Sequence, residues 1–201
     1  MYPTELKRLI KSIKTKDDMK YILTKYKRFC QSKHNFKIGK VIHVYDKFQT
    51  NYSYTLTGKK FDPEFKPAYT PRQMLMMGVF EGKYLNDCLL EFPREWFIDA
   101  FDKLSPEAPD ATINKFRIKS RMSISEWIKR GWIIGDDPRG WFQWYCRYYL
   151  GRREPEIDKI QIGRWKRYVR HYQQIKKNCG RDMKCRPKQR QSLLQWSWKV
   201  R

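Results

Sequence analysis

The stretch that decides the fold reads Gly140-Trp-Phe-Gln-Trp-Tyr-Cys-Arg-Tyr-Tyr-Leu-Gly-Arg-Arg153. The preceding Asp137-Pro138 is typical of a helix start, with an N-cap followed by proline at the first helical position, and Gly151 is typical of a helix end. On a helix over this stretch, aromatic residues lie on both sides. A helix that is apolar all round is normally enclosed by the rest of its domain. We therefore expect a central core helix; the alternative is a platform on which exposed nucleobases stack.

Helical patterns surround this stretch. Apolar residues at three- and four-residue spacing predict two helices within residues 6–29, and a capping box at Thr70 opens another. Further helices are expected to begin at Pro93, Ser123, Pro155 and Pro187. The helix from Pro155 is expected to end near Gly180. Residues 41–57 are rich in β-branched and aromatic residues, which favours a hairpin. The predicted fold class is mainly α, or α+β with a minor β-hairpin: a compact helical domain around an aromatic central helix.

Charge is distributed unevenly along the 201 residues, which carry 44 Lys+Arg against 21 Asp+Glu, a net charge of +23. Residues 1–40 hold twelve basic and three acidic residues, residues 41–138 fourteen of each, and residues 139–201 eighteen basic and four acidic. A neutral middle between basic ends suits a domain with one basic face, if both ends fold onto it. The most plausible boundary predicts a basic helical arm or subdomain over 1–38 and a main domain over 39–201.

Composition excludes several classes of protein. With 40% hydrophobic and 16% aromatic residues, the chain can bury a core, unlike a disordered basic tail. It has no run near the roughly 18 apolar residues of a membrane helix, and its start lacks the apolar centre of a signal peptide. We expect a soluble intracellular protein, whether nuclear, cytoplasmic or in a virion, without membrane insertion. The sequence does not determine the oligomeric state.

Five scattered cysteines without a framework spacing are expected to be reduced thiols. Four residues nevertheless have side chains suited to zinc: Cys146, His171, Cys179 and Cys185. Their spacing is irregular, and on one helix Cys179 would lie about 12 Å along the axis from His171. We therefore expect no metal and no cofactor. Cys179 and Cys185 have an alternative, which is to join as a disulfide after oxidation.

The net charge points to a polyanionic partner, because self-repulsion of this size destabilises a compact chain unless counterions relieve it. We expect nucleic acid, with DNA favoured over RNA, bound by a basic face built from residues 139–201 with help from the first two helices. The expected phosphate contacts are Arg139, Arg147, Arg152, Arg153, Arg164, Lys166, Arg167, Arg170, Arg186, Lys188 and Arg190. Trp196 and Trp198 are the aromatic residues expected to be exposed.

Two other function classes stay open. The chain has no phosphate-binding glycine loop, nucleophile elbow or zinc-protease motif, but an enzyme that modifies or repairs DNA bases could use Asp136, Asp137 and Glu126 in a base-binding pocket. A DNA-packaging or virion structural protein would instead neutralise DNA without specificity. A pocket where carboxylates and aromatic rings converge would favour the enzyme, whereas a smooth basic surface would favour binding or packaging.

Three segments carry a resemblance to a known family. They are residues 136–153, Thr70-Pro-Arg-Gln-Met74 and Gly78-Val-Phe-Glu-Gly-Lys-Tyr84. The chain resembles a family of small proteins from large DNA viruses, algae, plants, fungi and bacteria, and the likeness extends roughly from Thr70 to Trp196. Residues 140–153 are its most specific part. The resemblance implies no particular activity, and the spread of the family between viruses and cells is compatible with work on DNA.

Overall fold

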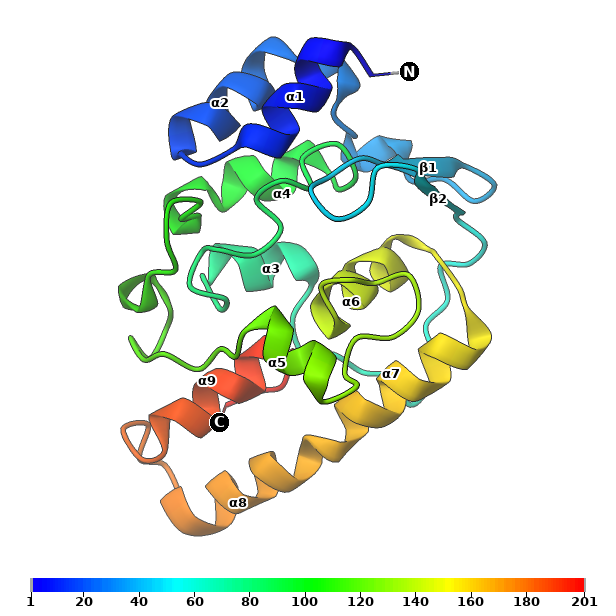
Figure 1. Ribbon diagram of the computed structural model, residues 1–201. Coiled ribbons are helices and arrows are strands. Elements are labelled where there is room, and N and C mark those ends of the chain that lie inside the picture. Colours follow the sequence, from blue (N-terminus) through cyan, green and yellow to red (C-terminus); the bar gives the residue numbers. More distant parts are fainter. Residues whose placement is uncertain (1, 201) are drawn as a thin grey trace.

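The computed structural model describes residues 2–200, which form a mainly helical fold with one β-hairpin, as the sequence predicts (Figure 1). The α-helices are α1 (Thr4–Ser12), α2 (Lys16–Lys25), α3 (Pro71–Met76), α4 (Arg94–Asp99), α5 (Ile124–Lys129), α6 (Trp141–Leu150), α7 (Pro155–Arg167), α8 (Val169–Cys179) and α9 (Pro187–Gln195). Short 3-10 helices cover Lys27–Phe29, Lys33–Asn35, Phe101–Lys103 and Ala111–Ile113.

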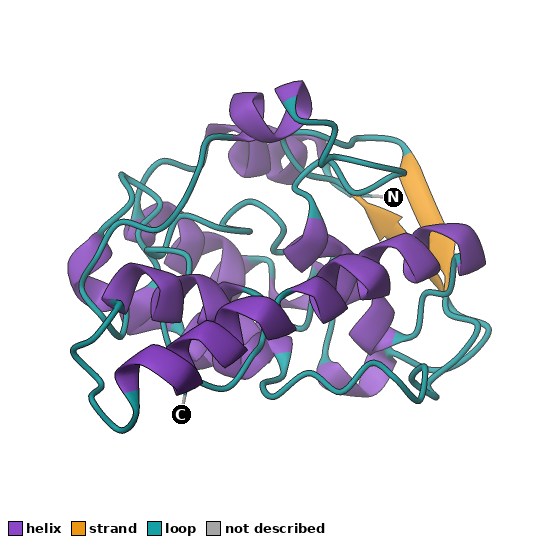
Figure 2. Ribbon diagram, turned by 90° about the horizontal axis from the view of Figure 1, so that it is seen from below, coloured by secondary structure: helices purple, strands orange, loops and turns teal. Residues whose placement is uncertain are grey.

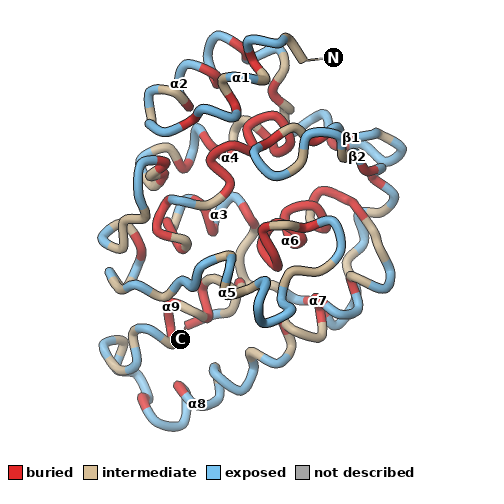
Figure 3. Tube along the Cα trace, viewed as in Figure 1, coloured by how far each residue is buried: buried red, intermediate tan, exposed pale blue. Residues whose placement is uncertain are grey.

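Helix α6 is the centre of the core, as expected. Nine of its ten residues are buried, all except Tyr149, and Figure 3 shows its trace as buried while α8 is largely exposed. The expected N-cap at Asp137 is wrong. The helix begins after Gly140, whose φ of 76° favours glycine, and the Gln143 side chain accepts a hydrogen bond from the Arg139 backbone N–H (2.9 Å). The Asp137 side chain does not cap α6, so its carboxylate can accept other hydrogen bonds.

The hairpin pairs β1 (Val41–Val44) with β2 (Tyr52–Thr55) in antiparallel register, with Val41 opposite Thr55 and Val44 opposite Tyr52. Figure 2 shows it at one edge of an otherwise helical molecule. Ile42 and Tyr54 lie directly opposite each other and are both buried. The sheet therefore adds one inward face to the core and does not form a layer of its own.

The expected single helix from Pro155 to Gly180 is two helices. The chain leaves the α-helical pattern at Tyr168, whose backbone N–H donates to the Trp165 carbonyl in a tighter turn (3.0 Å). The ring of Tyr168 stacks on Trp196, the residue just after α9, with ring centroids 4.4 Å apart. The break at Tyr168 thus lies where α7 and α8 pack against the C-terminal helix.

The two basic ends of the chain do not share a face. Helices α1 and α2 lie at one end of the molecule, above α4, and α8 lies at the opposite end (Figure 1). Apolar residues of α1 and α2 nevertheless belong to the same buried cluster as α6 and α9, and Arg94 Nε donates to the Leu23 carbonyl (2.6 Å). The division into 1–38 and 39–201 stays a prediction about independent folding.

Candidate functional site

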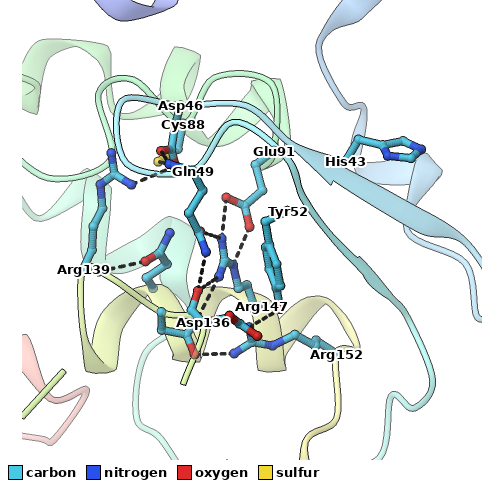
Figure 4. Close-up of polar contacts among 12 residues, drawn as sticks. His43, Asp46, Gln49, Tyr52, Cys88, Glu91, Asp136, Arg139, Arg147 and Arg152 are labelled. Carbon is cyan, nitrogen blue, oxygen red and sulfur yellow. Dashed lines mark hydrogen bonds and ion pairs between the residues drawn. The ribbon is translucent and has the colours of Figure 1, made fainter. Parts of the chain in front are cut away.

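A buried cluster of ion pairs surrounds the inner side of α6 (Figure 4). Arg147 is fully buried; its Nε lies 2.6 Å from Glu91 Oε1, and its Nη1 lies 3.0 Å from Asp137 Oδ1. Arg152 Nη2 binds the other oxygen of Asp137. Arg139 completes the cluster by pairing with Asp46 (2.8 Å) and Asp87 (2.6 Å).

This cluster corrects the predicted role of three arginines. We expected Arg139, Arg147 and Arg152 to contact phosphates, but each guanidinium is buried and already neutralised by carboxylates. A buried charge must be paired because its transfer out of water costs several kcal/mol. Burial lowers the pKa of Arg147, but the attraction and hydrogen bonds of Glu91 together with the attraction of Asp137 outweigh it, so that pKa is raised well above its usual range. These arginines form ion pairs inside the fold and are not part of a binding face.

Arg190 was also expected to contact phosphate, and its position in the structure contradicts this. Its side chain is buried at the turn between α8 and α9, where Nε donates to the Cys185 carbonyl (2.8 Å) and Nη2 to the Asp182 carbonyl (2.7 Å). It also donates to the Val200 carbonyl. Arg190 therefore ties this turn to the C-terminal segment and cannot reach a phosphate.

Two further predicted cations already have partners within the protein. Arg153 donates to the carbonyls of Tyr148 (2.6 Å) and Lys60 (2.9 Å), and its guanidinium lies 3.8 Å from the centroid of the Tyr148 ring. Lys166 pairs with Glu64. Arg186 and Lys188 are exposed at the start of α9, where a phosphate could reach them.

The three carboxylates suggested for catalysis do not meet. Asp137 is held between two arginines, Glu126 pairs with Arg130 on α5 (2.7 Å), and Asp136 is exposed with its carbonyl bound by Arg147. The structure contains a cavity between α5, α6, the α7–α8 junction and α9, and among the described residues no Asp or Glu lines it. The prediction of a base-binding pocket built from these three residues is wrong.

The four possible zinc ligands do not form a metal-ligand group within residues 2–200. Cys179 and Cys185 form a disulfide with Cα atoms 5.6 Å apart, so the expectation that all five cysteines are reduced is wrong. Cys146 is a buried free thiol on α6, and burial raises its pKa well above the usual value. His171 Nδ1 lies 3.0 Å from the Gln189 amide. The alternative of a disulfide between Cys179 and Cys185 is the one that the structure contains.

Reduction of this disulfide is expected to lower the free energy of unfolding by about 2 kcal/mol, because the bond closes only a short loop. Chemical denaturation with and without dithiothreitol measures this difference. A Cys179→Ser/Cys185→Ser variant should resemble the reduced protein and should not respond to reductant. Equal stability of the oxidised and reduced wild-type chains would contradict the expectation.

Sequence reasoning missed another group with metal-ligand chemistry. Ligand atoms of Asp46, Cys88 and Glu91 all lie within 4.8 Å of one another and are buried. Asp46 already accepts hydrogen bonds from Arg139 and from the Cys88 thiol, and Glu91 is paired with Arg147. Burial raises the pKa of Cys88 well above its usual value, which favours the neutral thiol. The charges of the group are thus balanced by arginines, as expected of a structural cluster.

A cavity of about 540 Å³ lies between α5, α6, the α7–α8 junction and α9. This volume lies within the range of pockets that bind small organic ligands. Eight aromatic residues contribute to its lining: Phe80, Tyr84, Trp127, Trp132, Trp141, Phe142, Tyr168 and Trp196. Planar apolar ligands are the chemistry that such walls favour.

Five cations also line the cavity: Lys83, Arg121, Arg164, Arg167 and Arg170. Arg164 donates to the carbonyls of Trp132 (2.7 Å) and Gly131 (3.2 Å), which fixes the end of α5 beside α7. Arg167 and Arg170 follow on the same wall and are exposed. Neither forms an ion pair within residues 2–200. The cavity therefore combines an aromatic interior with unneutralised positive charge.

The ion-pair cluster and the cavity share one wall. Arg139 belongs to the cluster, while the next three residues, Gly140, Trp141 and Phe142, line the cavity. A Cβ at Gly140 would lie 3.3 Å from the Trp127 ring, so glycine lets α5 approach α6 closely. The buried pairs fix the start of α6 and with it the position of the aromatic wall.

The two tryptophans that were expected to be exposed are both partly buried. Trp196 lines the cavity and its ring centroid lies 4.7 Å from that of Trp141. Trp198 stacks on Trp165 (4.8 Å) and donates its indole N–H to the Trp165 carbonyl (3.1 Å), outside the cavity. Sequence reasoning missed Trp127 and Trp132; the one signal for them is that Trp127 lies among the cations of residues 117–130 and Trp132 lies just after them.

Comparisons with protein-family models, with curated proteins and with solved structures found no match. The family resemblance therefore stays a prediction, and the function has to be argued from the site. None of the helices between residues 2 and 200 is long and apolar enough to cross a membrane.

Proposed function

We propose that this protein binds nucleic acid, with DNA favoured over RNA, through the surface around the cavity and along α8 and α9. The observation that carries the proposal is the pair Arg167 and Arg170, exposed cations without ion-pair partners among residues 2–200 at the wall of an aromatic cavity. Guanidinium groups bind phosphate oxygens with matching geometry. Aromatic faces suit the other component of a nucleic acid, its bases.

Further exposed cations lie beyond the cavity. Exposed cations that form no ion pair in the described part of the chain follow on α8 and α9 and in the turn between them: Lys176, Lys177, Arg181, Lys184, Arg186 and Lys188. A row of phosphates could neutralise such a surface and release its counterions, which is the main source of affinity in nonspecific nucleic-acid binding. This surface lies at the opposite end of the molecule from α1 and α2 (Figure 1), so the N-terminal cations are a separate region.

The Arg167→Ala/Arg170→Ala variant tests the proposal. Each phosphate contact contributes about 0.9 to the slope of log K against log salt for duplex DNA and about 0.7 for single strands. We expect the double variant to lower the magnitude of this slope by about one to two. Fluorescence anisotropy with a labelled oligonucleotide across a salt series gives the slope, and RNA of the same sequence tests the preference for DNA.

The matched control is Lys11→Ala/Lys14→Ala, which removes two exposed cations at the opposite end of the molecule. This variant has the same net charge as the test variant but should keep the wild-type slope. Equal slopes for the two variants would mean that overall charge, and not this surface, drives binding. Absence of binding at low salt would contradict the proposal itself.

A further inference from the structure

The cavity holds more apolar ring surface than phosphate binding requires. We propose that it accepts one unpaired nucleobase from a single-stranded or locally opened nucleic acid, with the adjoining phosphates at Arg167 and Arg170. This inference rests on the proposed function and names its substrate class. It goes beyond that function because a protein that only neutralises phosphates needs no base pocket.

The first argument is access. A base inside a duplex is stacked on both sides and paired at its edge, so it reaches a concave pocket only after it leaves the helix. The cavity of about 540 Å³ is a hollow between helices and not a groove along one element. It lies within the size range of small-ligand pockets, which suits one nucleoside and is far too small for a duplex.

The second argument is the arrangement of the rings. Trp141, Trp196 and Tyr168 form a continuous stack, with centroids 4.7 and 4.4 Å apart and interplanar angles of 32° and 21°. All three residues contribute to the cavity lining. Because these neighbours already cover both faces of Trp196, we expect a base to bind by extending the stack, with little dependence on base identity since every base has a π-face.

A second set of rings also lines the cavity. The Phe80 ring lies 4.4 Å from that of Phe142 and 4.8 Å from that of Tyr84, and all three residues line the same cavity. Polar side chains that could meet a base edge are interspersed with these rings, notably Ser192 and Gln195. Aromatic faces with few polar groups are the usual composition of a pocket for a planar heterocycle.

The third argument is charge at the wall. Arg164, Arg167 and Arg170 recur every three residues along the α7–α8 junction, and all three contribute to the lining. Burial lowers the pKa of Arg164, and the neighbouring charge of Arg167 lowers it further. A phosphate would relieve this repulsion. An uncharged aromatic ligand would not, so the charge favours a base that carries its phosphate.

Trp132, just after α5, can be mutated without disturbing the core. None of the residues of α5 is buried, and Trp132 is 42% exposed while it contributes to the cavity lining. Removal of its ring should leave the core intact. Tyr21 on α2 is also 42% exposed and lies at the far end of the molecule, so Tyr21→Ala is the matched control.

The experiment compares three labelled 12-residue probes of the same backbone chemistry: (dA)12, a strand of abasic sites, and the (dA)12·(dT)12 duplex. We expect wild-type protein to bind (dA)12 about tenfold or more tightly than the abasic strand, since stacking of one base is worth about 1–3 kcal/mol. Trp132→Ala should weaken (dA)12 binding about fivefold without affecting the abasic strand or the salt slope. Tyr21→Ala should change nothing.

An abasic strand that carries a single 2-aminopurine gives a second readout, because this base has no neighbouring base to quench it in the free strand and loses fluorescence when it stacks on an aromatic ring. We expect quenching with wild-type protein and a smaller effect with Trp132→Ala. Equal affinity for (dA)12 and the abasic strand would overturn the base pocket while leaving phosphate binding intact. Tighter binding of the duplex would also overturn it. Absence of binding to every probe would contradict the proposed function instead.

Discussion

Replacement of Arg147 by alanine is expected to destabilise the protein by about 3–5 kcal/mol. The guanidinium is fully buried and pairs with Glu91 and Asp137, so among residues 2–200 its removal leaves Glu91 in the core without an ion pair and Asp137 with Arg152 alone. A loss of this size approaches the whole stability of an ordinary domain, about 5–15 kcal/mol. Urea denaturation followed by circular dichroism at 25 °C measures the change.

Arg130→Ala is the matched control, because Arg130 pairs with Glu126 in a similarly short contact (2.7 Å) but on the exposed surface of α5. Exposed pairs are worth about 0–1 kcal/mol. The Arg147→Met/Glu91→Leu double variant should recover part of the lost stability, since an apolar pair removes both charges together. If Arg147→Ala and Arg130→Ala lower the free energy of unfolding by the same amount, the buried cluster does not stabilise the fold more than a surface ion pair does.

Trp144→Ala is the second change with a large expected effect, about 3–5 kcal/mol. Trp144 has no exposed surface in α6, and its indole N–H donates to Asp158 Oδ1 (2.8 Å). The substitution opens a cavity in the core and removes a donor from a buried carboxylate. Burial raises the pKa of Asp158 and the Trp144 hydrogen bond lowers it, so loss of that bond favours the protonated acid at higher pH.

Trp144→Phe separates the two contributions, since it keeps most of the apolar volume and removes only the donor. It should cost about 1–3 kcal/mol, the range for an unsatisfied buried polar group. Trp132→Ala removes a ring of the same type from a half-exposed position and should cost less than about 1 kcal/mol. Unchanged stability of Trp144→Ala would be incompatible with its place in the core.

Local features of the sequence predicted much of the fold. The capping box at Thr70 is present with both of its hydrogen bonds, and Gly151 ends α6 with φ of 119°. The aromatic run over residues 141–150 predicted the central helix because an element that is apolar all round has to be enclosed. Each of these features depends on residues within about one or two helical turns, so it can be recognised without the rest of the chain.

The candidate site could be predicted only in part. Arg164, Arg167, Arg170 and Trp196 were proposed from the sequence and all line the cavity. The lining rings of Phe80, Tyr84, Trp127 and Trp132 were not proposed, because no local pattern in the sequence connects them with the cavity. No pattern along the chain indicates that Trp127 and Phe142 share a cavity; the close approach of α5 to Gly140 places them together.

The sequence by itself determined the basic charge, the aromatic content and the helical fold; the tertiary structure alone decided which cations are available. Arg147 and Arg167 are the same residue type on neighbouring helices, yet one is fully buried and the other exposed. The difference arises because Glu91, 56 residues before Arg147 in the chain, lies against it in the fold. Desolvation and pairing depend on distance in space, which charge counts along a chain do not contain.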